Sequence, residues 1–477
     1  MKAFVSMLAL GAAMALAVEG PVARAGEPLA EGQKEAGPSE ELASRDHKMV
    51  INGRTIAYKA SAGTLIITDD DGVPRGSIFY TAYTAQGASA GKPRPLTFFN
   101  NGGPGSASLW LNVGGFGPKR PPTLTPKATL PAPYVVQDNP YSLLDKSDLI
   151  FIDAIGTGYS RPIGDTKGKA FWGVDADIDS FARAINRYIT KNDRWNSPRY
   201  LFGESYGTTR SAMVSYRLID SGMPVDGVIL MSSILNFAQR APGLDRMDIN
   251  YLPSYAATAW YHDKVVRGTG LEDHVARARQ FAQGPYAAAL AKGQDIGAQE
   301  RESELLRDRG AITGGFDTRF IGSEGDNAAD TAQSDPADDA ISGAIIANFS
   351  AYLAHDLGYA PDGDYVVNTP TLFPVWDWSH MPPGGPRQNA MANVAIDLGA
   401  AMRRAPQMRV LSLSGYYDLS TPFFATEFDL AHLYLPSALR SNLISRHYAS
   451  GHMLYLDGKT FNDVTRDVRG FIRANAD

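Results

Sequence analysis

A chain of 477 residues can hold one large α/β domain with an insertion, or two to four domains of average size. Its net charge of −6 gives no basic surface for nucleic acid, which we exclude as a partner. Because the sequence contains no cysteine, a cysteine nucleophile, disulfide bonds and thiolate-bound zinc are excluded as well.

The N-terminus predicts export. Lys2 precedes an apolar run over residues 3–18 that is short for a membrane span, and Ala23-Arg24-Ala25 forms a small-x-small cleavage site. We therefore interpret residues 1–25 as a signal peptide and expect a periplasmic or extracellular protein from a bacterial cell, without stable membrane insertion. An uncleaved anchor is less favoured, because no positive cluster follows the run. The polar residues 26–46 are predicted to be a disordered leader.

Residues 47–239 predict the first part of an α/β core. Alternating segments over 48–97 are typical of antiparallel strands joined by turns. Buried-type strands over 96–100, 148–153, 199–203 and 227–233 then alternate with segments of helical periodicity, such as 172–191. Strands and helices in this order form right-handed parallel crossovers.

A nucleophile elbow is predicted around Gly203-Glu204-Ser205-Tyr206-Gly207, where an apolar strand ends and a helix begins. The turn is tight, so it needs glycines, and it holds the serine oxygen over the end of the sheet. In hydrolases with this elbow, one oxyanion donor follows the serine, and another comes from a glycine-rich loop after an earlier strand. Residues 101–105 lie where that loop is expected.

The pattern changes over residues 240–385, which are helical or polar and contain no convincing buried strand. We predict that they form a cap inserted into the sheet domain, which continues over 386–477. The acidic stretch 323–339 is interpreted as a solvated loop rather than a metal site. We expect neither a metal nor a cofactor.

Two further residues complete a candidate triad with Ser205. In this fold the order is serine, then a carboxylate, then histidine, with the last two on loops after late strands. Of the eight histidines, His452 alone follows a late strand in a glycine-flanked loop, and Asp418 lies just past the strand 409–414. We predict that Ser205 is the nucleophile, His452 the base and Asp418 the residue that orients it.

The sequences Asn101-Gly102-Gly103-Pro104-Gly105 and Gly203-Glu204-Ser205-Tyr206-Gly207, with Asp418 and Gly451-His452-Met453, resemble the serine carboxypeptidases. That resemblance implies an α/β-hydrolase fold, a peptide substrate and hydrolysis of the C-terminal peptide bond, usually at acid pH. It also implies an oxyanion hole from the N–H groups of Gly103 and Tyr206. The substrate carboxylate would be held by Asn101, Gly102 and Glu204, and Glu204 can do so only when protonated.

The chain departs from the family in two places near the site. Gly115 stands where the family has a second carboxyl that pairs with the glutamate, so acid activity and exopeptidase preference are open. Ser106 stands where the family has a cysteine.

Two alternatives to a carboxypeptidase remain. An esterase or an acyltransferase would use the same triad, and a binding module would leave it unused. The side-chain preference and the oligomeric state are not predicted.

Overall fold

The computed structural model describes residues 38–476, apart from 88–92, 242, 269, 294–314 and 322–334. The predicted signal peptide, most of the leader and most of the acidic stretch lie outside the described residues. From Glu40 onward the chain belongs to one compact unit.

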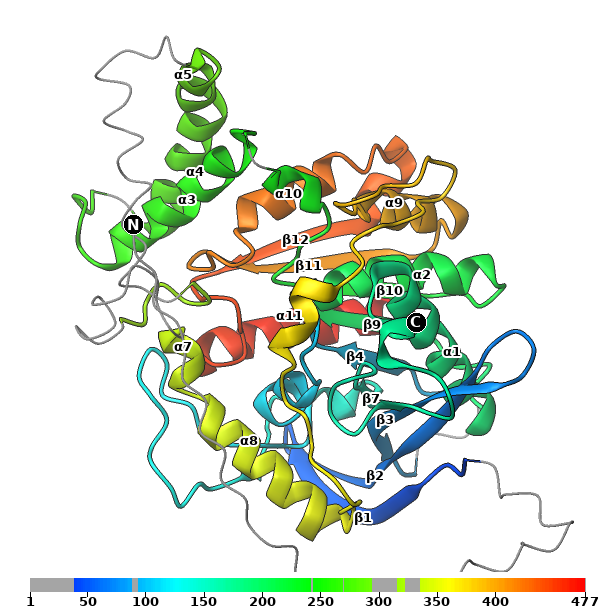
Figure 1. Cartoon of the computed structure of the whole chain (residues 1–477). Coiled ribbons are helices and arrows are strands. Elements are labelled where there is room, and N and C mark those ends of the chain that lie inside the picture. The colour runs from blue at the N-terminus through cyan, green and yellow to red at the C-terminus, as the bar shows by residue number, and fades with distance from the viewer. Residues whose placement is uncertain are drawn as a thin grey trace, which may run out of the picture. The chain divides into compact units, whose positions relative to one another are not determined.

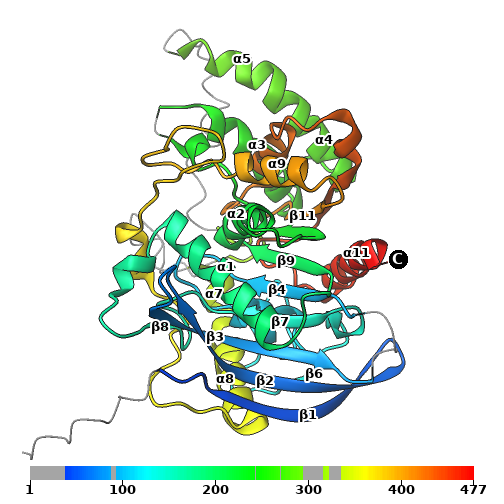
Figure 2. The same ribbon diagram turned by 90° about the vertical axis from the view of Figure 1, so that its right-hand side faces the viewer.

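A ten-stranded sheet runs through this unit in the order β1-β2-β3-β7-β4-β9-β10-β11-β12, with β8 paired to β3 (Figures 1 and 2). Its strands are β1 (Leu42–Ile51), β2 (Arg54–Thr68), β3 (Pro74–Ala85), β4 (Leu96–Asn100), β7 (Asp148–Ile152), β8 (Arg161–Pro162), β9 (Arg199–Glu204), β10 (Gly227–Met231), β11 (Arg409–Gly415) and β12 (Leu443–Tyr448). A separate ribbon pairs β5 (Lys119–Arg120) with β6 (Gln137–Asp138).

The sheet is mixed. Strands β1, β2, β3 and β8 join it antiparallel, and β3 also pairs antiparallel with β7. All pairs from β7 through β4, β9, β10 and β11 to β12 are parallel. The prediction of antiparallel edge strands followed by parallel crossovers is therefore confirmed.

The central strands are buried on both faces, which explains their continuous apolar sequence. Successive residues alternate between two cores, so that Phe98 and Leu201 face one core while Phe99 and Phe202 face the other. A strand with polar residues at every second position could not occupy the middle of this sheet.

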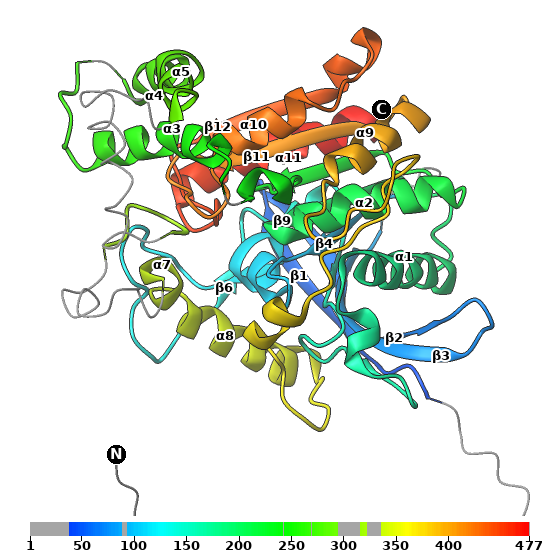
Figure 3. The same ribbon diagram turned by 45° about the horizontal axis from the view of Figure 1, so that its top comes forward.

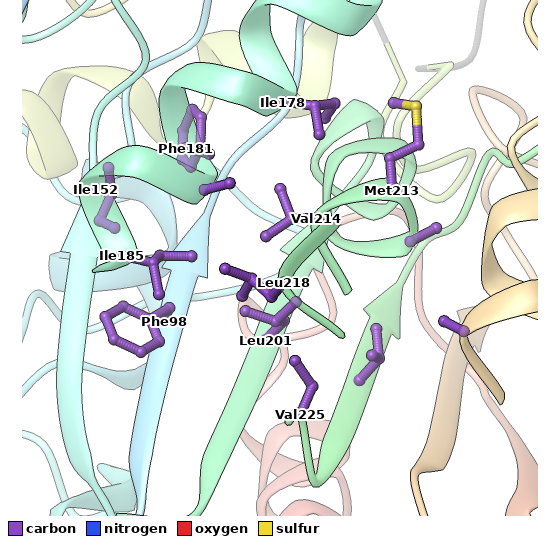
Figure 4. Close-up of a cluster of buried hydrophobic side chains, with 14 of the residues drawn as sticks. Phe98, Ile152, Ile178, Phe181, Ile185, Leu201, Met213, Val214, Leu218 and Val225 are labelled. Atoms are coloured by element: carbon purple, nitrogen blue, oxygen red, sulfur yellow. The ribbon is translucent and has the colours of Figure 1, made fainter. Parts of the chain in front are cut away.

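Three helices cover the first face: α1 (Val174–Lys191), α2 (Tyr206–Asp220) and α9 (Ala395–Arg404). Helix α1 buries Val174, Ile178, Phe181, Ile185 and Ile189, whose spacing of three or four places them on one side of the helix. Figure 4 shows several of these side chains packed against Phe98, Leu201 and residues of α2.

The second face is covered by α11 (Gly458–Ala476), by the π-helical turn η1 (Trp110–Phe116), and by α8 (Ser342–Ala351) with η10 (Tyr352–Leu357). Figure 3 shows α8 across the central strands from α1 and α2. Helix α11 buries Phe461, Val464, Val468 and Phe471 against the sheet. Full burial of such side chains stabilises the fold by about 1.5–3 kcal/mol each.

The segment 240–385, predicted as one cap, divides into two groups of helices. Near α10 (Phe423–Ala431) lie α3 (Arg246–Tyr261), α4 (Leu271–Phe281), η5 (Ala282–Tyr286) and α5 (Ala287–Leu290), which share a small apolar core with it (Figure 1). The later elements are α7 (Pro336–Asp339), α8, η10 and η11 (Pro370–Val375), of which α8 and η10 pack on the sheet itself. Their apolar faces complete the second core, so this half of the segment is part of the sheet domain's packing.

The remaining short helices lie in loops: η2 (Leu143–Asp145), η3 (Gly168–Phe171), η4 (Phe237–Arg240) and η12 (Ser437–Asn442).

The end of the predicted leader is ordered, so the prediction of disorder over residues 26–46 is wrong from Glu40 onward. Strand β1 begins at Leu42 and pairs with β2 along its whole length. Before it, Glu40 forms ion pairs with Arg187 and Lys191 of α1. Composition misled the prediction because an edge strand is held by backbone hydrogen bonds, which polar side chains do not prevent.

Within the described part of the chain, no helix is both long and apolar enough to cross a membrane.

Candidate active site

Ser205 lies on the turn between β9 and α2, as predicted, in a strained conformation with φ 59° and ψ −129°. Its side chain is partly exposed, whereas β9 before it and the first turns of α2 after it are buried. The turn is so tight that a Cβ on Gly203 would lie 2.0 Å from the carbonyl oxygen of Gly207. Glycine at this position is therefore required by space, and the strain presents the hydroxyl at the end of the sheet.

The glycine-rich loop after β4 touches this elbow. A Cβ on Gly102 would lie 2.5 Å from the backbone nitrogen of Tyr206 and 2.9 Å from the Cβ of Ser205. Tyr206 is the first residue of α2, so its N–H has no carbonyl one turn earlier in the helix to bind. The two segments expected to supply oxyanion donors, at Gly103 and Tyr206, are thus neighbours at the N-terminus of a helix, where the dipole favours negative charge.

His452 and Asp418 meet on the loops that follow β12 and β11. Nδ1 of His452 lies 2.8 Å from Oδ2 of Asp418, and both side chains are buried. Burial alone would lower the pKa of His452, but the negative charge of Asp418 outweighs it and raises the pKa. This arrangement leaves Nε2 as the imidazole nitrogen available to a reacting group, and His452 and Ser205 line the same pocket.

Two residues hold this pair in place. The Thr421 hydroxyl donates to Oδ2 of Asp418 at 2.6 Å, and its N–H donates to Oδ1 at 2.9 Å. From the inserted segment, the ring of Phe316 lies 5.1 Å from that of His452, and the Phe316 carbonyl accepts a hydrogen bond from the backbone N–H of His452 at 2.6 Å. The orientation of the imidazole is therefore determined from both sides.

A cavity of about 560 Å³ opens beside Ser205. Its described walls are largely apolar and come from the glycine loop, η1, the inserted segment and the His452 loop. They include Trp110, Phe316, Pro370, Phe373, Met453 and Tyr455, with Glu204 and Asp338 as the acidic residues. Among the described lining residues there is no lysine or arginine, so the polar side chains in this pocket are amides, carboxyls, hydroxyls and the His452 imidazole.

Asn101 and Glu204 form a buried pair at this pocket. Nδ2 of Asn101 donates to Oε2 of Glu204 at 2.8 Å, and both side chains are buried. Burial is the main cause that raises the pKa of Glu204 to about 7, while His452, Tyr455 and Asn101 pull it down. Glu204 can therefore carry a proton near neutral pH, although Gly115 supplies no second carboxyl.

Arg210, buried in α2, supports the backbone of this corner. It forms an ion pair with Asp177 of α1, with Nε 2.8 Å from Oδ2, and its Nη1 donates to the carbonyl of Asn101 at 2.6 Å. Burial raises the pKa of Asp177 although Arg210 opposes the rise. The helix pair α1 and α2 is thus tied to the glycine loop through one guanidinium.

Within the described residues, no group of three or more histidine, aspartate or glutamate side chains is placed to hold a metal ion.

The structure brings every predicted site residue to this corner, and it adds four that the sequence did not indicate: Arg210, Phe316, Thr421 and Tyr455. A signal existed for only two of them. Thr421 and Tyr455 each lie three positions after a predicted triad residue, on the same loop. Arg210 and Phe316 contact site residues that lie far away in the sequence, Asn101 and His452, and no local sequence pattern reveals such contacts.

Residues 55–224, which include the glycine loop and the elbow, match the sequence model of the serine carboxypeptidase family. Among solved structures, the fold is similar to a prohormone-processing carboxypeptidase from Saccharomyces cerevisiae, with a TM-score of 0.55 and 15% identity over 88% of this chain and 91% of that one. A proline iminopeptidase from Mycobacterium smegmatis aligns with a TM-score of 0.40 and 14% identity, over 87% of this chain and 98% of that one.

The yeast structure and the sheet order together confirm the predicted fold, an α/β-hydrolase with a mixed, mostly parallel sheet flanked by helices. The part of the chain that carries the glycine loop and the elbow, residues 55–224, thus resembles the serine carboxypeptidase family, and the described chain has the α/β-hydrolase fold.

Proposed function

We propose that the protein is an exported serine carboxypeptidase that removes the last residue of a peptide through an acyl-enzyme. Ser205 Oγ attacks the carbonyl of the C-terminal peptide bond while Nε2 of His452 takes its proton. His452 then gives that proton to the leaving amine, and the C–N bond breaks. Water attacks the resulting ester with His452 again as the base, which releases the shortened peptide and restores the Ser205 hydroxyl. Asp418 stabilises the imidazolium in both steps.

The negative oxygen of each tetrahedral intermediate would be bound by the N–H groups of Gly103 and Tyr206. Removal of one such donor costs about 3 kcal/mol of transition-state stabilisation in enzymes of this type. The close approach of Gly102 to the Tyr206 nitrogen supports this assignment, because it places the two segments that would supply these donors side by side.

One observation carries the carboxypeptidase assignment: the buried Asn101 and Glu204 pair lies in the pocket beside Ser205. A protonated carboxyl and an amide can both donate to a substrate carboxylate, and the N–H of Gly102 is a third donor on the same loop. An uncharged set of donors also suits a pocket whose described walls contain no lysine or arginine.

Kinetics on one blocked dipeptide as free acid, amide and ester test this proposal, with Ser205→Ala as the blank. We expect kcat/KM for the free acid to exceed that for the amide by at least tenfold below pH 7. Equal or faster turnover of the amide and the ester would assign the site to an esterase or acyltransferase instead. Failure of a fluorophosphonate to label Ser205 in the folded protein would leave a binding module.

Export is proposed from the apolar run 3–18 and the site at Ala25. N-terminal sequencing of the protein recovered from the periplasm or medium should begin at Gly26. Recovery of the full-length chain from the cytoplasm alone would contradict export.

A further inference from the structure

The ring of Tyr455 packs against Gly114 and Gly115, the second of which stands where the resemblance places a second carboxyl. A Cβ on Gly115 would lie 3.4 Å from both Cγ and Cδ1 of the Tyr455 ring, and a Cβ on Gly114 would lie 3.4 Å from Cε2. The ring is fully buried, and the backbone carbonyl of Tyr455 accepts from Nη2 of Arg120 at 2.9 Å.

The hydroxyl of this ring reaches Glu204. Tyr455 Oη lies 3.2 Å from Oε1 and 3.1 Å from Oε2 of Glu204, whose Oε2 also accepts from Asn101. Burial, followed by the nearby carboxylate of Glu204, raises the pKa of Tyr455 well above its usual value, so the phenol remains a neutral donor. Among the described residues, the side chains that form hydrogen bonds with the Glu204 carboxyl are thus two neutral donors, Asn101 and Tyr455.

We propose that Tyr455 positions Glu204 and sets the pH at which it loses its proton, and so the upper pH limit for binding substrates with a free carboxylate. The proposal rests on the carboxypeptidase function above. A phenol that donates to a carboxylate favours the ionised form of Glu204 and supplies no proton of its own. The ionisation of Glu204 alone therefore controls carboxylate binding. Two paired carboxyls would instead share a proton and titrate as a pair.

Other charges act on this pair and are unchanged by removal of the phenol. The charge of His452 favours ionised Glu204, and that of Asp418 opposes it. Asp338 opposes ionisation of Tyr455, whereas Arg120 favours it. A change confined to the Tyr455 hydroxyl therefore isolates its own hydrogen bond to Glu204.

The test is Tyr455→Phe, with Tyr448→Phe as the matched control, since Tyr448 donates to Asp467 at 2.8 Å outside the lining of the pocket. For the unmodified enzyme, KM for a free-acid dipeptide should rise tenfold per pH unit above about pH 7, with a single ionisation. In Tyr455→Phe this rise should begin on the order of one pH unit higher, because the ionised form has lost a donor. The control should keep the original profile.

Infrared spectra of the protonated carboxyl, assigned by the loss of its band in Glu204→Gln, report the same ionisation without substrate. We expect the band to titrate at higher pH in Tyr455→Phe than in the unmodified enzyme or the control. An unchanged midpoint in Tyr455→Phe would overturn the role of Tyr455. Absence of free-acid preference in the unmodified enzyme would instead overturn the carboxypeptidase function, so the two failures are distinguishable.

Discussion

His380 is buried between two carboxylates and should make the stability of the fold decrease at alkaline pH. Its Nδ1 lies 2.6 Å from Asp175 of α1, and its Nε2 lies 2.8 Å from Asp397 of α9. Burial opposes the imidazolium charge, but the two carboxylates outweigh it and raise the pKa of His380 from 6.5 to about 9. The same loop carries Trp376 and Trp378, whose rings pack on that of Tyr206.

The magnitude follows from linkage. A rise of the pKa from 6.5 to about 9 corresponds to about 3 kcal/mol, at 1.36 kcal/mol per pH unit. Two effects reduce this stabilisation to about 2 kcal/mol. Burial raises the pKa of Asp397, so part of the attraction offsets the cost of burying that carboxylate, and the Asp175 side chain is 43% exposed, so solvent screens its charge. Because the folded-state pKa is the higher one, this contribution is complete below pH 6.5 and is lost as pH rises through about 9.

Urea unfolding followed by tryptophan fluorescence should be measured for the unmodified enzyme and His380→Gln at pH 6, 7.5, 9 and 10. His432→Gln is the control, since His432 is exposed at the end of α10. The difference in unfolding free energy between the unmodified enzyme and His380→Gln should be about 2 kcal/mol larger at pH 6 than at pH 10. A difference that is the same at every pH would refute the reasoning, because a packing defect does not titrate.

Three further changes test the site. Glu204→Gln keeps an amide donor at every pH, so KM for free-acid substrates should no longer rise above pH 7; a rise that persists would mean that another group titrates. Asp177→Asn leaves Arg210 buried without its charged partner and should lower the free energy of unfolding in urea by about 3–5 kcal/mol. The double variant Asp177→Leu with Arg210→Met should lose less stability than this single variant. Stability losses that simply add between the two positions would contradict a coupled pair. Thr421→Val removes a donor to Asp418 and should lower kcat about tenfold with KM nearly unchanged, measured on the free-acid dipeptide; an unchanged kcat would show that the Asp418 carboxylate does not need this hydroxyl.

Much of the fold could be predicted because its signals are local. The central strands are apolar at successive positions, since both faces are buried, and α1 carries its apolar residues at helical spacing. The ordered structure at the end of the predicted leader was harder to predict from composition. The polar residues from Glu40 onward resemble a disordered leader, yet they pair with β2 and α1. Likewise α8 falls within the segment 240–385, which the sequence predicts as a cap because it contains no buried-type strand, whereas the apolar face of α8 fills the second core.

The sequence by itself was enough to predict the positions of Ser205, Asp418 and His452. Each lies where a strand ends, and the carboxyl ends of parallel strands meet at one edge of the sheet. The glycines of the elbow and its neighbouring loop are equally readable, because close approach of backbones leaves space for no other residue.

Only the tertiary structure decided the surroundings of Glu204 and the other buried polar pairs. Tyr455 is 251 positions away from it, Arg210 is 109 positions from Asn101, and His380 is 205 positions from Asp175. Such pairs have no local periodicity and are created when loops from separate crossovers pack together. Their consequence is electrostatic, since burial and the choice of partner together determine whether a carboxyl keeps its proton at neutral pH.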